Sequence, residues 1–173
     1  MTTAQVANLT TTQMEAMETA DLRALTTAQA GVLSSAQIDA LSTAQLVAIE
    51  TADLRNLQTA SLAGLGTAHM AALTSAQVAA LSTGQVAALS TEQVAAIVTA
   101  NMAALSTAQI RALPDGSVTA LTTAQIVALN SAQVASLTTS QVVALDTAQV
   151  AAIETADFRA MTGTQVAVLS SAQ

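Results

Sequence analysis

Apolar and polar positions follow one another along this chain with a fixed period of eight residues. The period is clearest over Thr74–Ile97, which reads TSAQVAAL, STGQVAAL and STEQVAAI. Counted from Thr2, 21 complete octads run to Leu169, and Ser170–Gln173 begin another. A short fixed period is typical of repeat architectures, in which each unit buries its apolar side against its neighbours. The sequence therefore predicts one octapeptide-repeat array over residues 1–173, forming a single domain.

Each position of the octad has its own residue preference. Position 5 is always apolar, and position 8 is Leu, Ile or Met. Position 1 is variable, whereas position 2 is Thr or Ser everywhere except at Asp115 and Gly163. Position 4 is always polar and in most octads is Gln, while Ala recurs at positions 3 and 7. Position 6 accepts charged residues, which indicates that it faces solvent.

Three conformations can be tested against this pattern. In a strand, residues three apart lie on opposite faces, so positions 5 and 8 would not share a core. In one continuous helix, eight residues rotate by about 800°, and the apolar stripe would drift by about 80° per repeat. One short helix per octad, with a corner at positions 8 and 1, brings positions 5 and 8 inward together. The predicted fold is therefore an all-α solenoid of very short helices.

Several local features follow from the short-helix hypothesis. The strict Thr or Ser at position 2 is interpreted as the helix N-cap, because these residues are preferred there. The recurrent Gln is expected to bond either the corner carbonyls or the Gln of neighbouring coils, since a buried amide needs partners. The octad that begins with Pro114 keeps apolar Val118 and Leu121 in phase. We interpret it as a decorated corner, capped by Asp115, and not as a linker.

Composition narrows the possible functions. Eleven acidic residues against four basic ones give a net charge of −7, which repels nucleic acids and anionic membranes. No segment approaches the roughly 20 apolar residues that span a membrane, so membrane insertion is not expected. The absence of Cys excludes disulfides and thiolate metal sites. Because of the negative net charge, nucleic-acid partners are not expected either.

Two features of the sequence are candidate sites. Three octads share the sequence E-T-A-D-x-R, and their arginines Arg23, Arg55 and Arg159 could mark an acidic-ligand or cation site. Surface ion pairs with acids on adjacent coils are the simpler interpretation. His69 occupies the Gln position with no second metal-ligating residue in phase, which favours a hydrogen-bonding substitute. No catalytic, cofactor-binding or metal-ligating residue is predicted, and no cofactor.

Two resemblances bear on function. Leu89–Ile97, L-S-T-E-Q-V-A-A-I, resembles the first helix of a TAL-effector repeat, but the second helix, the base-reading loop and the basic charge are missing. Essentially the whole chain resembles tandem L-[ST]-T-A-Q-[VIL]-x-A arrays of very large, repetitive bacterial proteins. Those proteins are described as secreted, surface or adhesin-like. This second resemblance implies a spacer or structural role and an extracellular or cell-surface location.

The resulting hypothesis is a non-catalytic structural segment, acting as a stalk, spacer or filament-forming part of a bacterial extracellular protein. A protein- or glycan-binding solenoid is the first alternative. Ice or surface binding through the threonines of positions 1 and 2 is the second. An enzyme is not expected, because no octad concentrates ionisable groups.

The ends of the array suggest one possible partner. The pattern begins and stops in mid-array, which is expected of a fragment of a longer repeat. Each terminal coil should then expose core residues, namely Val6 and Leu9 at one end and Val166 and Leu169 at the other. Capping repeats normally cover such surfaces in solenoids. End-to-end self-association is therefore predicted.

Overall fold

The computed structural model describes residues 1–173 and contains only helices. Each of the 21 complete octads forms one helix of four to six residues, which confirms the predicted all-α repeat solenoid. The helices are α1 (Thr3–Ala7), α2 (Thr11–Glu15), α3 (Thr19–Arg23), α4 (Thr27–Ala30), α5 (Ser35–Asp39), α6 (Thr43–Ala48), α7 (Thr51–Asn56), the 3₁₀ helix η1 (Thr59–Gly64), α8 (Thr67–Ala72), α9 (Ser75–Ala80), α10 (Thr83–Ala87), α11 (Thr91–Ala95), α12 (Thr99–Met102), α13 (Thr107–Ala112), α14 (Asp115–Val118), α15 (Thr123–Val127), α16 (Ser131–Ser136), α17 (Thr139–Ala144), α18 (Thr147–Ala152), α19 (Thr155–Phe158) and α20 (Gly163–Ala167).

The helix N-cap is position 1 of the octad, and its prediction at position 2 is wrong. In α10, for example, Ser82 is the N-cap and its side chain accepts a hydrogen bond from the backbone N–H of Gln85. The Gln85 side chain in turn accepts from the backbone N–H of Ser82, which completes a capping box. The capping box pairs the N-cap residue with a Gln three residues later, so a Gln at position 4 favours a capping residue at position 1. Position 2 is the first helical residue.

The corners lie at positions 8 and 1, as predicted. After α9 the backbone is extended at Leu81 (φ −56°, ψ 137°) and at Ser82 (φ −71°, ψ 158°). No residue of the chain has a positive φ. The chain therefore turns at every octad without needing glycine in a left-handed conformation, which explains why Leu can occupy the corner.

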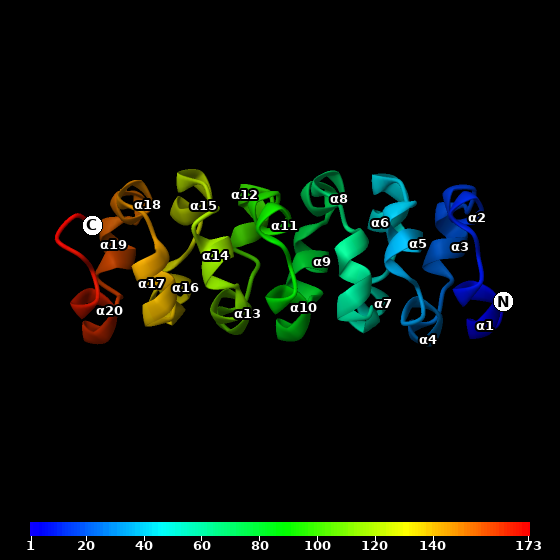
Figure 1. Ribbon diagram of the computed structural model, residues 1–173, viewed down its shortest axis with the longest axis horizontal. Helices are drawn as coiled ribbons and strands as arrows, with labels where there is room; N and C mark the ends of the chain where they lie inside the picture. The colour runs from blue at the N-terminus through cyan, green and yellow to red at the C-terminus, as the bar shows by residue number, and fades with distance from the viewer.

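Helices three octads apart pack against one another. Such pairs include α4 with α7, α10 with α13, and α13 with α16. Hydrogen bonds between coils join residues 28 and 31 positions apart, as from Gln37 to Leu9 and Val6. One superhelical turn, called a coil below, therefore takes between three and four octads. Figure 1 shows the coils stacked into an elongated body with the two termini at opposite ends.

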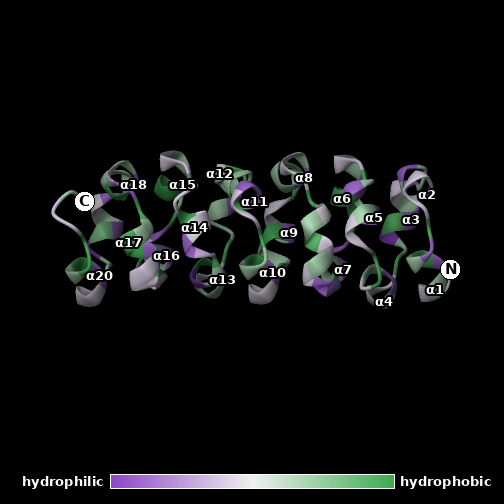
Figure 2. Cartoon of the chain, in the orientation of Figure 1, coloured by the Kyte–Doolittle hydropathy of each residue, from purple (hydrophilic) through white to green (hydrophobic).

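Positions 5 and 8 form a continuous apolar core along the stack. From Leu33 to Leu145 every position-8 side chain is buried, and position 5 is buried from Val6 to Val150. In Figure 2 hydrophobic and hydrophilic stretches alternate within the short helices along the whole body. The burial of these side chains confirms the assignment of positions 5 and 8 to the interior. The exposure predicted for Val6 is wrong, because the following coil covers this side chain and leaves it fully buried.

Two coils approach each other closely at Gly64, which occupies position 7 of its octad. A Cβ atom added to Gly64 of η1 would lie 2.0 Å from the backbone oxygen of Ser35 in α5. No ordinary side chain fits at that distance, so glycine at position 64 permits this contact between η1 and α5. The recurrent Ala at position 7 is consistent with close packing of backbones elsewhere in the stack.

The octad that begins with Pro114 continues the stack without interruption. Val118 is fully buried and Leu121 is 4 % exposed, as in neighbouring octads. The interpretation as a corner, and not a linker, is confirmed. The prediction of Asp115 as the cap is wrong, because Pro114 is the N-cap residue and Asp115 is the first residue of α14.

Candidate functional site

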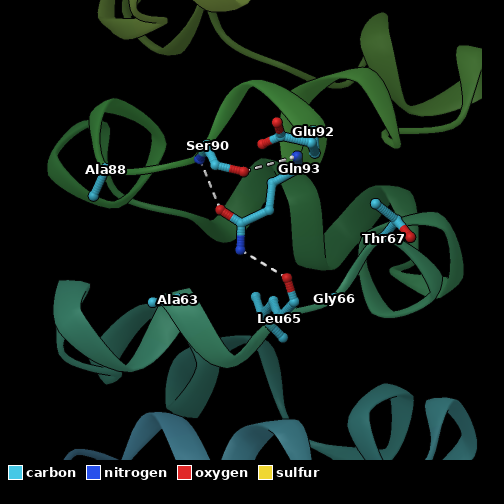
Figure 3. Close-up of a pocket in the computed structure, with 8 residues that line it drawn as sticks. All are labelled: Ala63, Leu65, Gly66, Thr67, Ala88, Ser90, Glu92 and Gln93. Carbon is cyan, nitrogen blue, oxygen red and sulfur yellow. Dashed lines mark hydrogen bonds between the residues drawn. The ribbon is translucent and has the colours of Figure 1, made fainter.

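The glutamines at position 4 form the most regular polar arrangement in the molecule. Gln93 of α11 shows its geometry (Figure 3). Its Oε1 accepts from the backbone N–H of Ser90 at 2.8 Å. Its Nε2 donates to the carbonyl oxygens of Leu62 and Leu65, at 2.6 and 2.7 Å, in the preceding coil. One side chain thus caps its own helix and binds the coil before it.

The same arrangement recurs along the array. From Gln37 onward, every position-4 glutamine donates to at least one backbone carbonyl 28 to 31 residues earlier. These glutamines are Gln37, Gln45, Gln77, Gln85, Gln93, Gln109, Gln125, Gln133, Gln141, Gln149, Gln165 and Gln173. The carbonyl 28 residues earlier always belongs to position 8, which confirms that the row bonds corner carbonyls. We call these contacts the inter-coil bonds.

Three of the residues that replace Gln preserve the bond to the corner. Ser61 and Asn101 donate to position-8 carbonyls 28 residues earlier. His69 does the same toward Leu41, with Nε2 2.6 Å from the carbonyl oxygen. The Nδ1 atom of His69 accepts a hydrogen bond from the backbone N–H of Gly66, with 3.2 Å between the two nitrogens. The ring proton is therefore on Nε2, which donates to Leu41. His69 is therefore a hydrogen-bonding substitute, as predicted.

Two buried aspartates occupy the same position with different chemistry. Asp53 is 3 % exposed, and burial, together with the nearby Glu50, raises the pKa of its carboxyl. Asp157 is 8 % exposed and accepts a hydrogen bond from the Ser131 hydroxyl. A carboxylate has no proton to donate, so neither residue repeats the inter-coil bond when ionised.

The E-T-A-D-x-R octads do not gather their charges at one place. Asp53 and Asp157 are turned into the stack, whereas Arg23, Arg55 and Arg159 are exposed. Arg23 and Glu50, from different coils, border one open hollow of 340 Å³. The structure contains no group of three or more His, Cys, Asp and Glu side chains placed to hold a metal ion.

The hollow drawn in Figure 3 has a volume of 290 Å³ and lies between two coils. Gly66, which has no side chain, stands where most octads carry Ser or Thr, and it lines the hollow together with Thr67 and Ser90. Glu92 is the one ionisable side chain at this hollow. Hydrogen bonds from its own backbone, and then from the Ser90 side chain, lower its pKa. The hollow thus offers one carboxylate beside an inter-coil bond.

The hydroxyls at position 2 form a second regular feature. Their constancy predicted a helix N-cap at position 2, but the N-cap lies at position 1. All these residues are exposed except Ser131, which is half-buried. Only Ser75 and Ser131 donate from the hydroxyl to another side chain, Asn101 and Asp157 respectively. The remaining hydroxyls make no hydrogen bond within the chain. The helix cap therefore does not explain why position 2 is so constant.

Comparison with known proteins identifies the repeat. The family model described as the ALTTAQ repeat matches seven times, over residues 14–48, 46–83, 70–99, 79–107, 94–131, 118–152 and 150–173. No curated protein and no solved structure matches the chain. None of the helices has the length and apolar character that crossing a lipid bilayer requires.

Proposed function

We propose that this chain, which belongs to the ALTTAQ repeat family, is a non-catalytic structural segment that acts as a stalk or spacer. The observation that carries this proposal is the inter-coil bond. It uses the most regular polar side chain of the octad to fasten each coil to the one before it. The hydrogen bonds that recur in the interior therefore hold neighbouring coils together.

Continuity of the core supports a stiff body. The buried side chains of positions 5 and 8 form one cluster that runs from Val6 to Met161. A linker would interrupt such a cluster, because a hinge needs a region with few buried contacts. In a solenoid each unit contacts only its neighbours, so adding octads extends the body without rearranging it. Length can therefore be set by the number of repeats.

A location outside the cell, on a bacterial surface, is part of the proposal. It is supported by the resemblance of the octads to the arrays of very large bacterial surface proteins. A stalk at such a surface must span a distance, and an elongated stack of coils suits that task.

Small-angle scattering on lengthened variants tests the spacer role. Inserting a second copy of Thr74–Ile97 directly after Ile97 should increase the longest dimension in proportion to the three octads added. The control variant carries a Gly/Ser-rich insertion of equal length at the same corner, which should leave the rod length unchanged. A particle that grows equally in all directions, or a rod unchanged by the octad insertion, would contradict the proposal.

A second candidate function rests on the position-2 hydroxyls. They are exposed, constant and mostly unbonded within the chain, which suits recognition of an ice surface or of a hydroxyl-rich glycan. Position-1 hydroxyls are occupied by helix capping, so only position 2 remains available for this role. Thermal-hysteresis measurements on the chain and on a variant with Thr83 and Thr107 replaced by Lys test the ice-binding form. Absence of hysteresis in the unmodified chain would exclude it.

A further inference from the structure

Two of the hollows on the outside of the stack are equivalent. One lies at Arg23 and has a volume of 340 Å³, and the other lies at Arg111 and has a volume of 330 Å³. Seven lining residues of the second hollow stand 88 residues after seven of the first, each at the same octad position. In the second hollow these are Arg111, Ala135, Leu137, Thr138, Thr139, Thr162 and Gln165. Because coils lie on both sides of the hollow at Arg23, such a hollow belongs to the stack itself. We call the second one the Arg111 hollow.

Three successive coils build the Arg111 hollow. Arg111 comes from α13, the corner between α16 and α17 supplies Thr138 and Thr139, and α20 with its N-cap supplies Thr162 and Thr164. Helix α13 packs against α16, and α17 packs against α20. Inter-coil bonds of 3.0 and 2.8 Å also join α20 to α16 and to the corner that follows it. The walls of the hollow are therefore fixed by the stack before any ligand arrives.

The charge of the Arg111 hollow distinguishes it from the other hollows of the structure. Each of the other three is lined by a carboxylate, which is Glu92, Glu50 or Asp39. Arg111 is the one ionisable side chain that lines its hollow, and it is exposed and forms no ion pair within the chain. A guanidinium presents several N–H donors in a planar fork that matches a carboxylate. This hollow therefore suits an anionic group.

Hydroxyl groups line the same hollow. The Thr139 hydroxyl makes no hydrogen bond within the chain. The Thr138 hydroxyl accepts from the backbone N–H of Gln141 at 3.0 Å, and its own O–H donates to no other group of the chain. The hydroxyl oxygens of Thr162 and Thr164 lie 3.0 Å apart. A hydroxyl both donates and accepts hydrogen bonds, so these groups match the ring hydroxyls of a sugar.

We propose that the Arg111 hollow binds a sugar unit that carries a single carboxylate, as a uronic acid does. The Arg111 guanidinium pairs with the carboxylate, and the hydroxyls of Thr138 and Thr139 bond the ring hydroxyls. A carboxylate alone would fill only a small part of the 330 Å³. A polyanion is disfavoured by the net charge of −7. This site is additional to the spacer role and does not depend on it, because a rod that binds no sugar would still be a spacer.

The arginine signals in nuclear magnetic resonance spectra test the site. The chain has only four arginines, so their Nε–H resonances can be followed one by one, and Arg111→Gln assigns one of them. Glucuronate is added at low ionic strength, since salt screens the ion pair. The Arg111 resonance should shift at concentrations at least roughly tenfold lower than those that shift Arg23, Arg55 and Arg159. Equal shifts of all four resonances would overturn the proposal.

Two further probes separate the sugar from its charge. Glucose, which lacks the carboxylate, should not shift the Arg111 resonance at the concentrations at which glucuronate does. Acetate, which lacks the sugar ring, should bind about two- to tenfold more weakly than glucuronate, the factor expected for one hydrogen bond. Equal binding of acetate and glucuronate would overturn the sugar proposal, because any carboxylate, including that of an acidic peptide, would then suffice.

Variants at Thr139 locate the binding in this hollow. Thr139→Glu places a carboxylate beside Arg111 and should weaken glucuronate binding at least roughly tenfold. Thr51→Glu, at the same place in the hollow at Arg23, is the matched control and should leave the Arg111 shift unchanged. Thr139→Ala should reduce the preference for glucuronate over acetate. Both threonines are exposed, and circular dichroism checks that the variants fold. Undiminished binding by Thr139→Glu would place the sugar elsewhere and refute the site.

Discussion

Replacement of Gln85 by Ala is the most direct test of the inter-coil bond. The Gln85 side chain accepts from the Ser82 N–H at 2.8 Å and donates to the carbonyls of Leu54 and Leu57 at 3.0 and 2.9 Å. The residue is 1 % exposed, so water cannot replace these contacts without a change in packing. Alanine removes all three hydrogen bonds and leaves the helix propensity of the octad intact.

The expected cost follows from these three contacts. Each hydrogen bond contributes about 0.5–1.5 kcal/mol net, and a buried group left without a partner costs about 1–3 kcal/mol. The Leu54 carbonyl keeps its bond from the backbone N–H of Leu57, so it is not orphaned. The expected loss in free energy of unfolding is therefore about 2–4 kcal/mol.

Ser82→Ala is the matched control within the same octad. It removes the bond from the Gln85 backbone N–H to the Ser82 hydroxyl, 3.1 Å long, and leaves the inter-coil bond in place. Loss of an N-cap costs about 1 kcal/mol. The difference between the two variants measures the contact between coils.

Urea unfolding followed by the helical circular-dichroism signal supplies both values, provided that the slope with denaturant is unchanged. Equal costs for the two variants would mean that Gln85 acts only as a capping residue. The stack would then be held by its apolar core alone, and the main support for the proposed function would be lost.

The remaining predictions concern packing and charge, and unfolding in denaturant measures each of them. Gly64→Ala should cost about 1–3 kcal/mol, because a backbone oxygen of the neighbouring coil lies 2.0 Å from the new Cβ, whereas Gly84→Ala meets no close atom and should not destabilise. Leu89→Ala should cost about 2–5 kcal/mol, since this side chain is 3 % exposed. Glu50→Ser with Asp53→Gln restores the capping box and the inter-coil bond, and should add about 1–3 kcal/mol at neutral pH. The raised pKa means that native Asp53 holds its proton to higher pH than the unfolded chain does, so this residue lowers stability as pH rises above 3.8, and the gain should shrink in acid.

The octad pattern was sufficient to predict the elements and the interior. Positions 5 and 8 can face one core only if the helix is short and the chain turns at each repeat. Both requirements are local, because they depend on residue spacing within eight positions. The structure agrees at Leu81 and Ser82, where the corner is extended, and at Val78, which is fully buried.

The cap was misplaced although the sequence held the necessary signal. Wherever position 4 is Gln, position 1 is Thr, Ser, Asn or Asp, all of which cap helices well. Wherever position 1 is another residue, as at Glu18, Val98 or Pro114, position 4 is not Gln. Positions 1 and 4 thus vary together, which is the mark of a capping box. The near-constant Thr or Ser at position 2 favoured that position as the cap, although positions 1 and 4 carry the capping signal.

The coil geometry could not be predicted from the octads. The number of octads per coil, between three and four, and the hydrogen bonds between residues 28 and 31 positions apart depend on how the turns at successive corners add up. No residue pattern within one repeat determines that sum. The octads also do not show whether the preceding or the following coil covers a position-5 side chain. A sequence shows that Val6 and Val166 are equivalent, but only the assembled coils show that the first is covered and the second is not.

The identity of the position-4 residue follows from the shortness of the helices. A helix leaves its first four N–H and last four C=O groups without intrahelical partners, so a five-residue helix consists almost entirely of ends. Gln meets this demand twice, accepting an N–H at its own cap and donating to the carbonyl end of an octad in the coil before. His69, which also places an acceptor and a donor far apart, makes both contacts. Asn101 is shorter and bonds the corner carbonyl of Leu73, while the preceding N-cap, Val98, receives no side-chain bond. The octad therefore selects a side chain long enough to join two coils, and this requirement makes Gln recur along the array.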